Sequence, residues 1–136
     1  VLTGGRSDLE ADYGDRLAAG SEATNLVGQS SLKQLAALIA AADLVICPDS
    51  GPAHMATAFG TGVIGLYASS NPQRTGPYLS QKYTINRYPD AIKQHLGRNV
   101  ADVRWGQRVR HPDVMSLIKA EDVVQNIDYF FDDRGS

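Results

Sequence analysis

DLVICPDSGPAHMATAFGTGVIGLY, residues 43–67, is the stretch that decides the fold of this chain. It begins with a short apolar run, Leu44 to Cys47, whose β-branched residues are typical of a parallel strand that is buried on both faces. Residues 53–59 then form a short helix, whose apolar ridge of Met55 and Phe59 should lie close against a sheet. Glycines end this helix, and residues 63–67 predict the next strand. The stretch therefore predicts a strand-loop-helix-strand unit.

The loop inside this unit, Pro48 to Pro52, has the composition of an anion-binding site. Asp49 or Ser50 can cap the following helix, and Pro52 fits its first turn, where a missing N–H costs little. Free backbone N–H groups and the positive end of the helix dipole then point at the same spot. His54, in the first turn, could donate to a phosphate or support the loop.

The rest of the chain predicts alternating strands and helices. We expect strands at residues 1–3 and 25–27, an edge strand at 83–86, and helices at about 8–19 and 32–42, with residues 132–136 frayed. Leu9, Tyr13 and Leu17 should form the buried stripe of the first helix, and Ser31 with Gln34 a capping box for the second. Alternation of this kind predicts an α/β fold, a doubly wound parallel sheet of Rossmann-like form in a single domain.

Size and composition fit one ordinary globular domain. The chain has 136 residues, 43% hydrophobic content and a formal net charge of −2, and no apolar run approaches the roughly 20 residues of a membrane span. Its single cysteine, Cys47, is expected to be a packed strand residue in a reducing, cytoplasmic compartment. We expect no metal site, no cofactor and no nucleic-acid partner.

Ligands of such sheets bind beyond the carboxyl ends of the strands, which here predicts one rim made of four loops. These are residues 4–8, 28–31, 48–52 and 68–75. They are rich in Gly and Ser, which let a phosphate approach the backbone, and they carry Arg6 and Arg74, which could neutralise it. The alternative is that Gly4, Gly5 and Gly28 are merely turn residues.

Two spaced motifs resemble the ADP-heptose:lipopolysaccharide heptosyltransferases, a family of GT-B glycosyltransferases. The first is D-S-G-P-x-H-x-A-x-A-x-G-T-x-V-I-x-L-Y, from Asp49 to Tyr67. The second, G-Q-S-S-L-K-Q-L-A-A-L-I-A-A-A-D-L-V-I from Gly28 to Ile46, is similar to the family pattern G-x-x-S-L-x-E-L-x-x-L-I-x-x-A-D-L-V. One departure is Gly62, where the family usually has Pro.

The resemblance implies that residues 1–136 are the nucleotide-sugar-binding domain, the C-terminal half of a GT-B fold. It would lack its first strand and the N-terminal acceptor domain, which would also supply the catalytic base, so no catalytic residue is assigned within the chain. The implied reaction transfers heptose from ADP-heptose to the lipopolysaccharide inner core. The candidate donor-binding residues are Gly4, Gly5, Glu10, Gly28, Asp49, Ser50, Gly51, Pro52, Ala53, His54 and Arg74.

Two of these candidates have specific expected roles. The resemblance implies that Glu10 contacts the adenosine part of the donor; otherwise it lies on a solvated helix face. Asp49 follows a buried strand, and its carboxylate would repel a diphosphate unless it faced away, so we expect it to accept hydrogen bonds from sugar hydroxyls. If it were only a helix cap, Asn would replace it well.

Two other functions remain open. A GT-B epimerase acting on UDP-N-acetylglucosamine would need further acids on the rim, and a flavodoxin-like nucleotide or phosphate sensor would start at its own first strand. A basic segment, containing Lys93, Arg98, Arg104, Arg108 and Arg110 with Trp105, is either a solvated connection or a surface for a phosphorylated lipid acceptor or an anionic membrane face. The second reading would make the protein peripheral at the inner face of the inner membrane.

Overall fold

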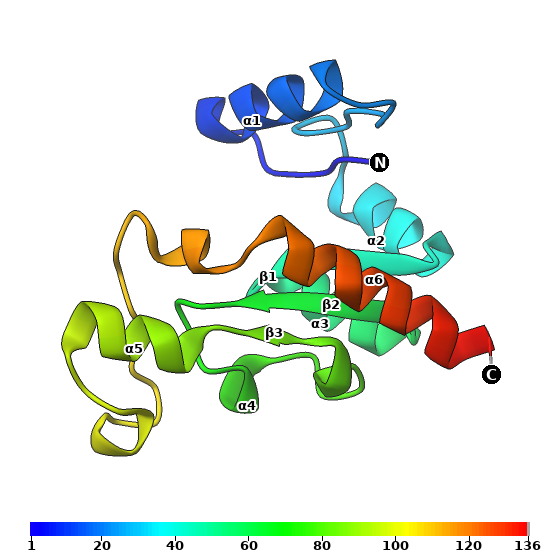
Figure 1. Ribbon diagram of the computed structural model, residues 1–136. Helices are drawn as coiled ribbons and strands as arrows, with labels where there is room; N and C mark the ends of the chain where they lie inside the picture. The colour runs from blue at the N-terminus through cyan, green and yellow to red at the C-terminus, as the bar shows by residue number, and fades with distance from the viewer. Residues whose placement is uncertain (136) are drawn as a thin grey trace. The chain divides into compact units, whose positions relative to one another are not determined.

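The structure is a computed structural model that describes residues 1–135. The chain divides into two compact units, Val1–Leu38 and Ile39–Ser136, and each is described here by itself. Figure 1 labels the helices and strands of both. The predicted α/β class is confirmed, with a three-stranded parallel sheet and six α-helices in the described part.

The first unit contains α1, Asp8–Ala19, which begins where the sequence predicts. Ser7 is its N-cap and accepts a hydrogen bond from the Glu10 N–H. The expected strands at 1–3 and 25–27 are reduced to one isolated parallel bridge between Leu2 and Asn25, because the two segments share too few backbone hydrogen bonds to extend it. The expected buried stripe is also wrong, since the side chains of Leu9, Tyr13 and Leu17 are exposed.

The helix α2, Leu32–Ala41, runs from the first unit into the second. Its start confirms the predicted capping box. The Ser31 N–H donates to Gln34 Oε1 at 2.8 Å, and Ser31 Oγ accepts from the Gln34 N–H at 3.2 Å. Ile39, on its apolar face, is buried.

The sheet of the second unit consists of β1, Leu44–Pro48, β2, Gly62–Tyr67, and β3, Ile85–Asn86. The order is β1-β2-β3 and both pairs are parallel, with Val45 opposite Val63 and Leu66 opposite Ile85. The expected strand at 83–86 is thus present as a two-residue edge strand, preceded by a 3₁₀ turn. Parallel neighbours mean that the carboxyl ends of all three strands lie at the same edge.

Helices cover both faces of this sheet, as expected for doubly wound folds (Figure 1). The helix α3, Gly51–Phe59, packs on β1 and β2, with Ala53 and Ala56 fully buried. The helix α6, Ala120–Gly135, packs on β2 and β3 and buries Phe130. Alternation along the strands assigns Ile64 and Leu66 to the α6 face, where they belong to the same cluster as Phe130.

Two burial expectations on the central stretch are wrong. Ile46 is 42% exposed, because it is on an edge strand whose α6-side face is left open at this point. Phe59 is 50% exposed, so the apolar ridge expected for α3 is not what packs on the sheet. Alanines pack there instead, which allows α3 to lie close to the strands.

The ring of Phe130 lies directly over Gly62 at the start of β2. A Cβ added at Gly62 would stand 2.2 Å from Phe130 Cε2, so no side chain fits there without moving the ring. This contact gives a physical reason for glycine at the position where the family resemblance leads one to expect proline.

The remaining elements of the second unit are α4, Pro72–Thr75, α5, Tyr88–Leu96, and 3₁₀ turns. A separate core cluster joins α5 to Val109 and Val114 of the following segment. The tail expected to fray from residue 132 instead continues α6 to Gly135, where Asp133 accepts hydrogen bonds from Lys82 and Tyr83; Ser136 lies outside the described residues. Among the residues described, no helix is long and apolar enough to cross a membrane.

Candidate functional site

Asp49 is the centre of a hydrogen-bond cluster at the carboxyl edge of the sheet. It follows β1, and its Oδ2 accepts three bonds: from Ser70 Oγ at 2.8 Å, from Thr75 Oγ1 at 3.2 Å and from Arg108 Nη2 at 2.9 Å. The Asp49 side chain is only 10% exposed. This cluster therefore ties the loop after β2 and the segment around residue 108 to the end of β1.

The helix α3 begins immediately after Asp49, with an N-terminus that lacks a side-chain cap. Ser50 occupies the N-cap position with extended backbone, but its hydroxyl donates backwards to the Pro48 carbonyl at 3.1 Å. The expected cap by Asp49 or Ser50 is therefore wrong in its side-chain contact, although Pro52 does stand in the first turn. Within residues 1–135, no side-chain carboxylate or hydroxyl caps the positive end of this helix.

Gly51, the first residue of α3, faces open space. A Cβ added there would meet nothing within 4 Å, and its φ is not positive. Neither packing nor backbone strain therefore requires glycine at this position. His54, one turn along, is also exposed, whereas Ala53 is fully buried and its N–H bonds the Ser50 carbonyl at 3.1 Å.

Two buried titratable groups lie beneath the Asp49 cluster. Burial raises the pKa of the Tyr67 hydroxyl, with the nearby Asp49 charge as a second cause, and this hydroxyl donates to the Thr75 carbonyl at 3.2 Å. Burial also raises the pKa of the Cys47 thiol to about 11. Cys47 is thus a protonated, packed residue at neutral pH, as predicted, and not a nucleophile.

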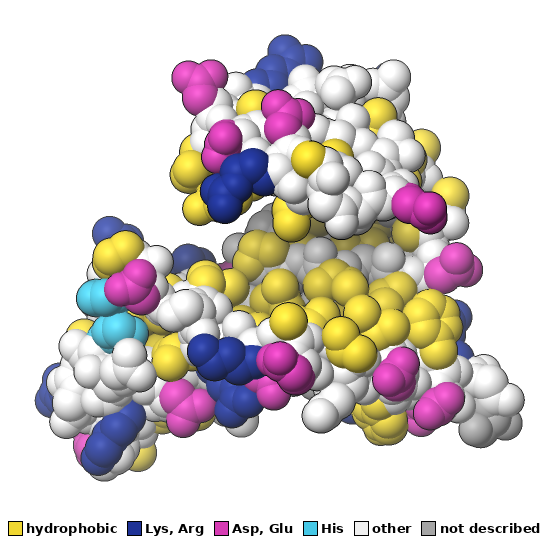
Figure 2. Space-filling view, turned by 45° about the horizontal axis from the view of Figure 1, so that its top comes forward, with side chains coloured by type: hydrophobic (Ala, Val, Ile, Leu, Met, Phe, Trp, Pro, Cys, Tyr) yellow, Lys and Arg dark blue, Asp and Glu magenta, His cyan; other side chains and the backbone are white. Residues whose placement is uncertain are grey.

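Arg74 packs beside Gly106, two positions before Arg108. A Cβ at Gly106 would stand 3.5 Å from Arg74 Cζ, so the guanidinium lies next to this glycine. Figure 2 shows the lysine and arginine side chains of one face interspersed with acidic ones, and two histidines together. The rings of His95 and His111 stack, with their centroids 4.1 Å apart.

In the first unit, Glu10 forms its own local cluster. Glu10 Oε1 accepts from the Gly5 N–H at 2.8 Å, and Oε2 accepts from Ser7 Oγ at 2.6 Å. The Ser7 hydroxyl and then the Gly5 N–H lower the pKa of Glu10, although the carboxylate is exposed. The structure therefore brings Gly5 and Glu10 together.

The glycines of this first cluster have structural reasons of their own. Gly28 has φ +72°, donates its N–H to the Gly4 carbonyl at 3.1 Å and would place a Cβ 3.3 Å from the Gly5 carbonyl oxygen. A Cβ at Gly5 would stand 2.7 Å from Glu10 Oε2, and one at Gly4 would stand 3.2 Å from Val27 Cγ1. The turn alone thus explains these glycines, and their contact with a donor stays a prediction.

Comparison with known proteins adds a family to this geometry. The family model described as glycosyltransferase family 9 (heptosyltransferase) matches residues 1–100. The chain belongs to glycosyltransferase family 9. It is 43% identical over 101 residues to the lipopolysaccharide core heptosyltransferase OpsX of Haemophilus influenzae, covering 74% of this chain and 29% of that protein.

Other relatives agree with the family 9 assignment. Lipopolysaccharide heptosyltransferase 2 of Salmonella typhimurium is 37% identical over 91 residues, 64% of this chain and 26% of that protein. Lipopolysaccharide heptosyltransferase 3 of Escherichia coli is 32% identical over 130 residues, which cover 91% of this chain and 34% of that protein. The chain spans about a third or less of these relatives. No solved structure matches it.

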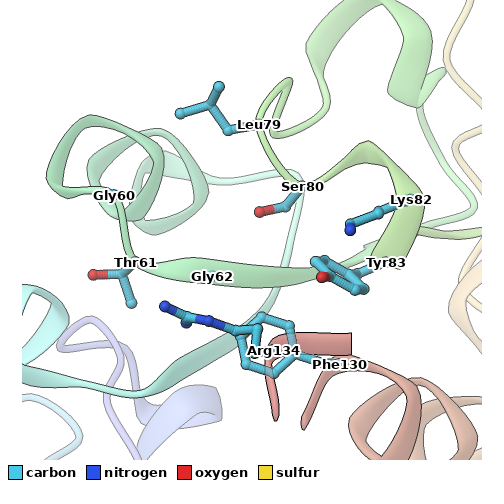
Figure 3. A pocket seen from close by; sticks show the side chains of 9 residues that line it. All are labelled: Gly60, Thr61, Gly62, Leu79, Ser80, Lys82, Tyr83, Phe130 and Arg134. Atoms are coloured by element: carbon cyan, nitrogen blue, oxygen red, sulfur yellow. The ribbon is translucent and has the colours of Figure 1, made fainter. Parts of the chain in front are cut away.

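A separate pocket of about 260 Å³ lies at the amino edge of the sheet, opposite the carboxyl edge that carries Asp49 (Figure 3). It opens at Gly62, the amino end of β2, between α6 and the turn that carries Ser80 and Tyr83. The two basic side chains that line it already have protein partners: Lys82 pairs with Asp133, and Arg134 lies over the Phe130 ring. The pocket is therefore not the predicted rim.

The residues that sequence reasoning missed in this family 9 chain are the partners of Asp49. Ser70 lies in the predicted rim loop 68–75, where nothing in the sequence singles it out, and Arg108 is marked only as a member of the basic segment. No local signal connects residues 21 and 59 positions apart. For Glu10 a signal existed, because Ser7-x-x-Glu10 is itself a capping-box pattern. No group of residues suited to a metal ion occurs within residues 1–135.

Proposed function

We propose that this chain binds the nucleotide-sugar donor of a heptosyltransferase, ADP-heptose, through the start of α3. The observation that supports this most is Gly51: it begins a helix without a neighbour or a positive φ that requires glycine there. Room next to a backbone N–H is what a phosphate needs. The family 9 assignment favours this reading over an epimerase or a phosphate sensor.

The proposed chemistry of this site is stabilisation of the departing diphosphate. In heptose transfer, an acceptor hydroxyl attacks the anomeric carbon, the bond to the diphosphate breaks, and negative charge develops on ADP. The free N–H of Gly51 and the positive end of the nine-residue helix α3 would offset this charge, and they need no rearrangement to do so. Ser50 and His54, both at the same helix end, are the side chains available for further contacts.

The carboxylate of Asp49 would have to bind the sugar while it keeps its hydrogen bonds to the protein. All three protein bonds described for Asp49 fall on Oδ2. The second oxygen, Oδ1, is the one that we assign to heptose hydroxyls. Asp49 would then both hold the loops in place and orient the sugar.

The other parts of the proposal rest on the family resemblance. Glu10, whose oxygens are held by Gly5 and Ser7, is assigned to the adenosine part of the donor. The lipopolysaccharide inner-core acceptor and the catalytic base are assigned to sequence outside this chain. A peripheral contact with the inner membrane is included because Trp105 and its neighbouring arginines are exposed.

Gly51→Ala tests the donor site directly. Alanine should leave the melting temperature unchanged or raise it, because it favours helix and meets no neighbour. Its methyl group should nevertheless weaken ADP binding about tenfold, measured by calorimetry. Gly135→Ala, another helical glycine with nothing within 4 Å of an added Cβ, is the matched control and should bind like wild type. Equal ADP affinity of Gly51→Ala and wild type would contradict the proposal.

The chain alone should bind a donor without transferring its sugar. Transfer requires donor and acceptor to be held together, and the acceptor site is assigned to another part of the protein. Incubation of the chain with ADP-heptose and a core acceptor should therefore give no glycosylated product. Appreciable transfer would refute the assignment of the base.

A further inference from the structure

We infer that Arg108 is a further donor-binding residue, which contacts the diphosphate of the nucleotide while it is paired with Asp49. This inference rests on the proposed function of the α3 start. It assigns a residue beyond the part of the chain that the family model matches, which ends at residue 100.

The backbone on both sides of Arg108 is anchored. On one side, the Tyr88 hydroxyl donates to the Gln107 carbonyl at 2.7 Å. On the other, the Val109 N–H donates to the Ser69 carbonyl at 2.9 Å, and the Val109 side chain is 2% exposed within the cluster formed with α5. Arg108 is thus held in place in an otherwise irregular segment.

The side chain between these anchors points at the carboxyl edge of the sheet. Arg108 Nη2 lies 2.9 Å from Asp49 Oδ2, while the arginine side chain remains 47% exposed. Asp49 and Gly51 are two positions apart, which limits their Cα separation to about 7 Å. The ion pair therefore holds the guanidinium on a side chain that comes two positions before the start of α3.

The charges of Arg108, Asp49 and the N-terminus of α3 together favour binding of an anion. A guanidinium near the positive end of a helix is unfavourable unless negative charge compensates both. Asp49 supplies one negative charge, which it shares with two hydroxyl donors, and this balances Arg108 but not the helix end. A nucleoside diphosphate brings further negative charge to the same spot.

The geometry of arginine suits this bridging role. A guanidinium has five N–H donors in a planar fork, and the bond to Asp49 uses one of them. The remaining donors can reach a phosphate oxygen while Asp49 keeps the group oriented. Arg108 would thus act on the donor, and Asp49 would position Arg108.

The test compares Arg108→Gln with Arg110→Gln in the 136-residue chain, using ADP and adenosine as probes. Arg110 is exposed, lies on the other side of Val109 and loses the same charge. We expect Arg108→Gln to weaken ADP binding about tenfold and to leave adenosine binding unchanged, whereas Arg110→Gln should change neither. Arg108→Lys keeps the charge but not the fork and should fall between Arg108→Gln and wild type.

Each other outcome has a distinct meaning. If wild type binds ADP but Arg108→Gln binds it equally well, Arg108 is only the ion-pair partner of Asp49 and the inference is overturned. Equal losses for ADP and adenosine, or an equal loss in Arg110→Gln, also overturn it, because they indicate a folding defect or a diffuse charge effect. If wild type binds neither probe, the proposed function itself fails.

Discussion

Glu10 and Asp49 are both carboxylates that accept hydrogen bonds from hydroxyl groups, but Glu10 bonds to near neighbours in sequence and Asp49 to distant residues. The bonds of Glu10 stay within five positions along the chain and lie in an exposed turn. Asp49 binds residues 21, 26 and 59 positions away, with its side chain 10% exposed. The comparison shows that a local cluster shapes one turn, whereas a long-range cluster determines whether separate segments stay together.

The largest expected effect is that of Asp49→Ala. Removing the carboxylate leaves the buried Ser70 hydroxyl and the Arg108 guanidinium without their partner, so the free energy of unfolding should fall by about 3 kcal/mol. Asp49→Asn keeps an acceptor oxygen and should cost about 1 kcal/mol. Urea unfolding measures both, and similar costs for Ala and Asn would mean that the amide oxygen of Asn cannot replace the carboxylate, contrary to this expectation.

Gly28→Ala tests whether the Glu10 turn depends on its backbone rather than on its carboxylate. Alanine at φ +72° is strained, and its Cβ would press on the Gly5 carbonyl oxygen, so we expect a cost of about 1–2 kcal/mol. Gly20→Ala, whose nearest contact would be 3.8 Å away at negative φ, is the control and should be close to neutral. A neutral Gly28→Ala in denaturant unfolding would remove the backbone explanation.

Ser70→Ala tests one bond of the Asp49 cluster. Loss of the hydroxyl should cost about 1 kcal/mol of unfolding free energy, since Asp49 Oδ2 keeps its two other donors. Combined with Asp49→Ala, the serine change should add almost nothing, because its partner has already gone. Full additivity in this double-mutant cycle would argue against a shared cluster.

The smallest effect is the pH dependence of the Glu10 turn. Hydrogen bonds from Ser7 and Gly5 lower the pKa of Glu10 in the folded state. The ionised carboxylate therefore stabilises the turn fully at pH values above 4.5, the ordinary pKa of the group. This contribution is lost as the pH falls through the lower, folded pKa. An NMR titration of the Gly5 amide should therefore show a midpoint below 4.5, and Ser7→Ala should move it upward. A midpoint at 4.5 in the unmodified chain would contradict the hydrogen bonds.

Local patterns in the sequence predicted the elements that depend on neighbouring residues. The start of α1 at Asp8, the capping box of Ser31 with Gln34, and the strand-helix-strand unit around α3 are present where expected. The parallel sheet and its two helical faces followed from alternation of the elements.

The sequence could not predict what depends on distant partners. Periodicity assigned Leu9 and Leu17 to a core, but burial depends on what else packs there, and both are exposed in the structure. Asp49 and Gly51 lie at the end of β1 and the start of α3, as the sequence predicts, yet the three partners of Asp49 come from loops whose approach only the folded chain reveals. Whether the candidate residues contact a donor stays a prediction.

The contact between Gly62 and the Phe130 ring restricts how this chain can diverge. A residue with a side chain at position 62 requires a smaller group at position 130, since the two would occupy the same space. Either change alone leaves an overlap or a void, so an evolutionary path between the two arrangements passes through a less stable intermediate. Positions 62 and 130 should therefore vary together among homologues, although they lie 68 positions apart in the sequence.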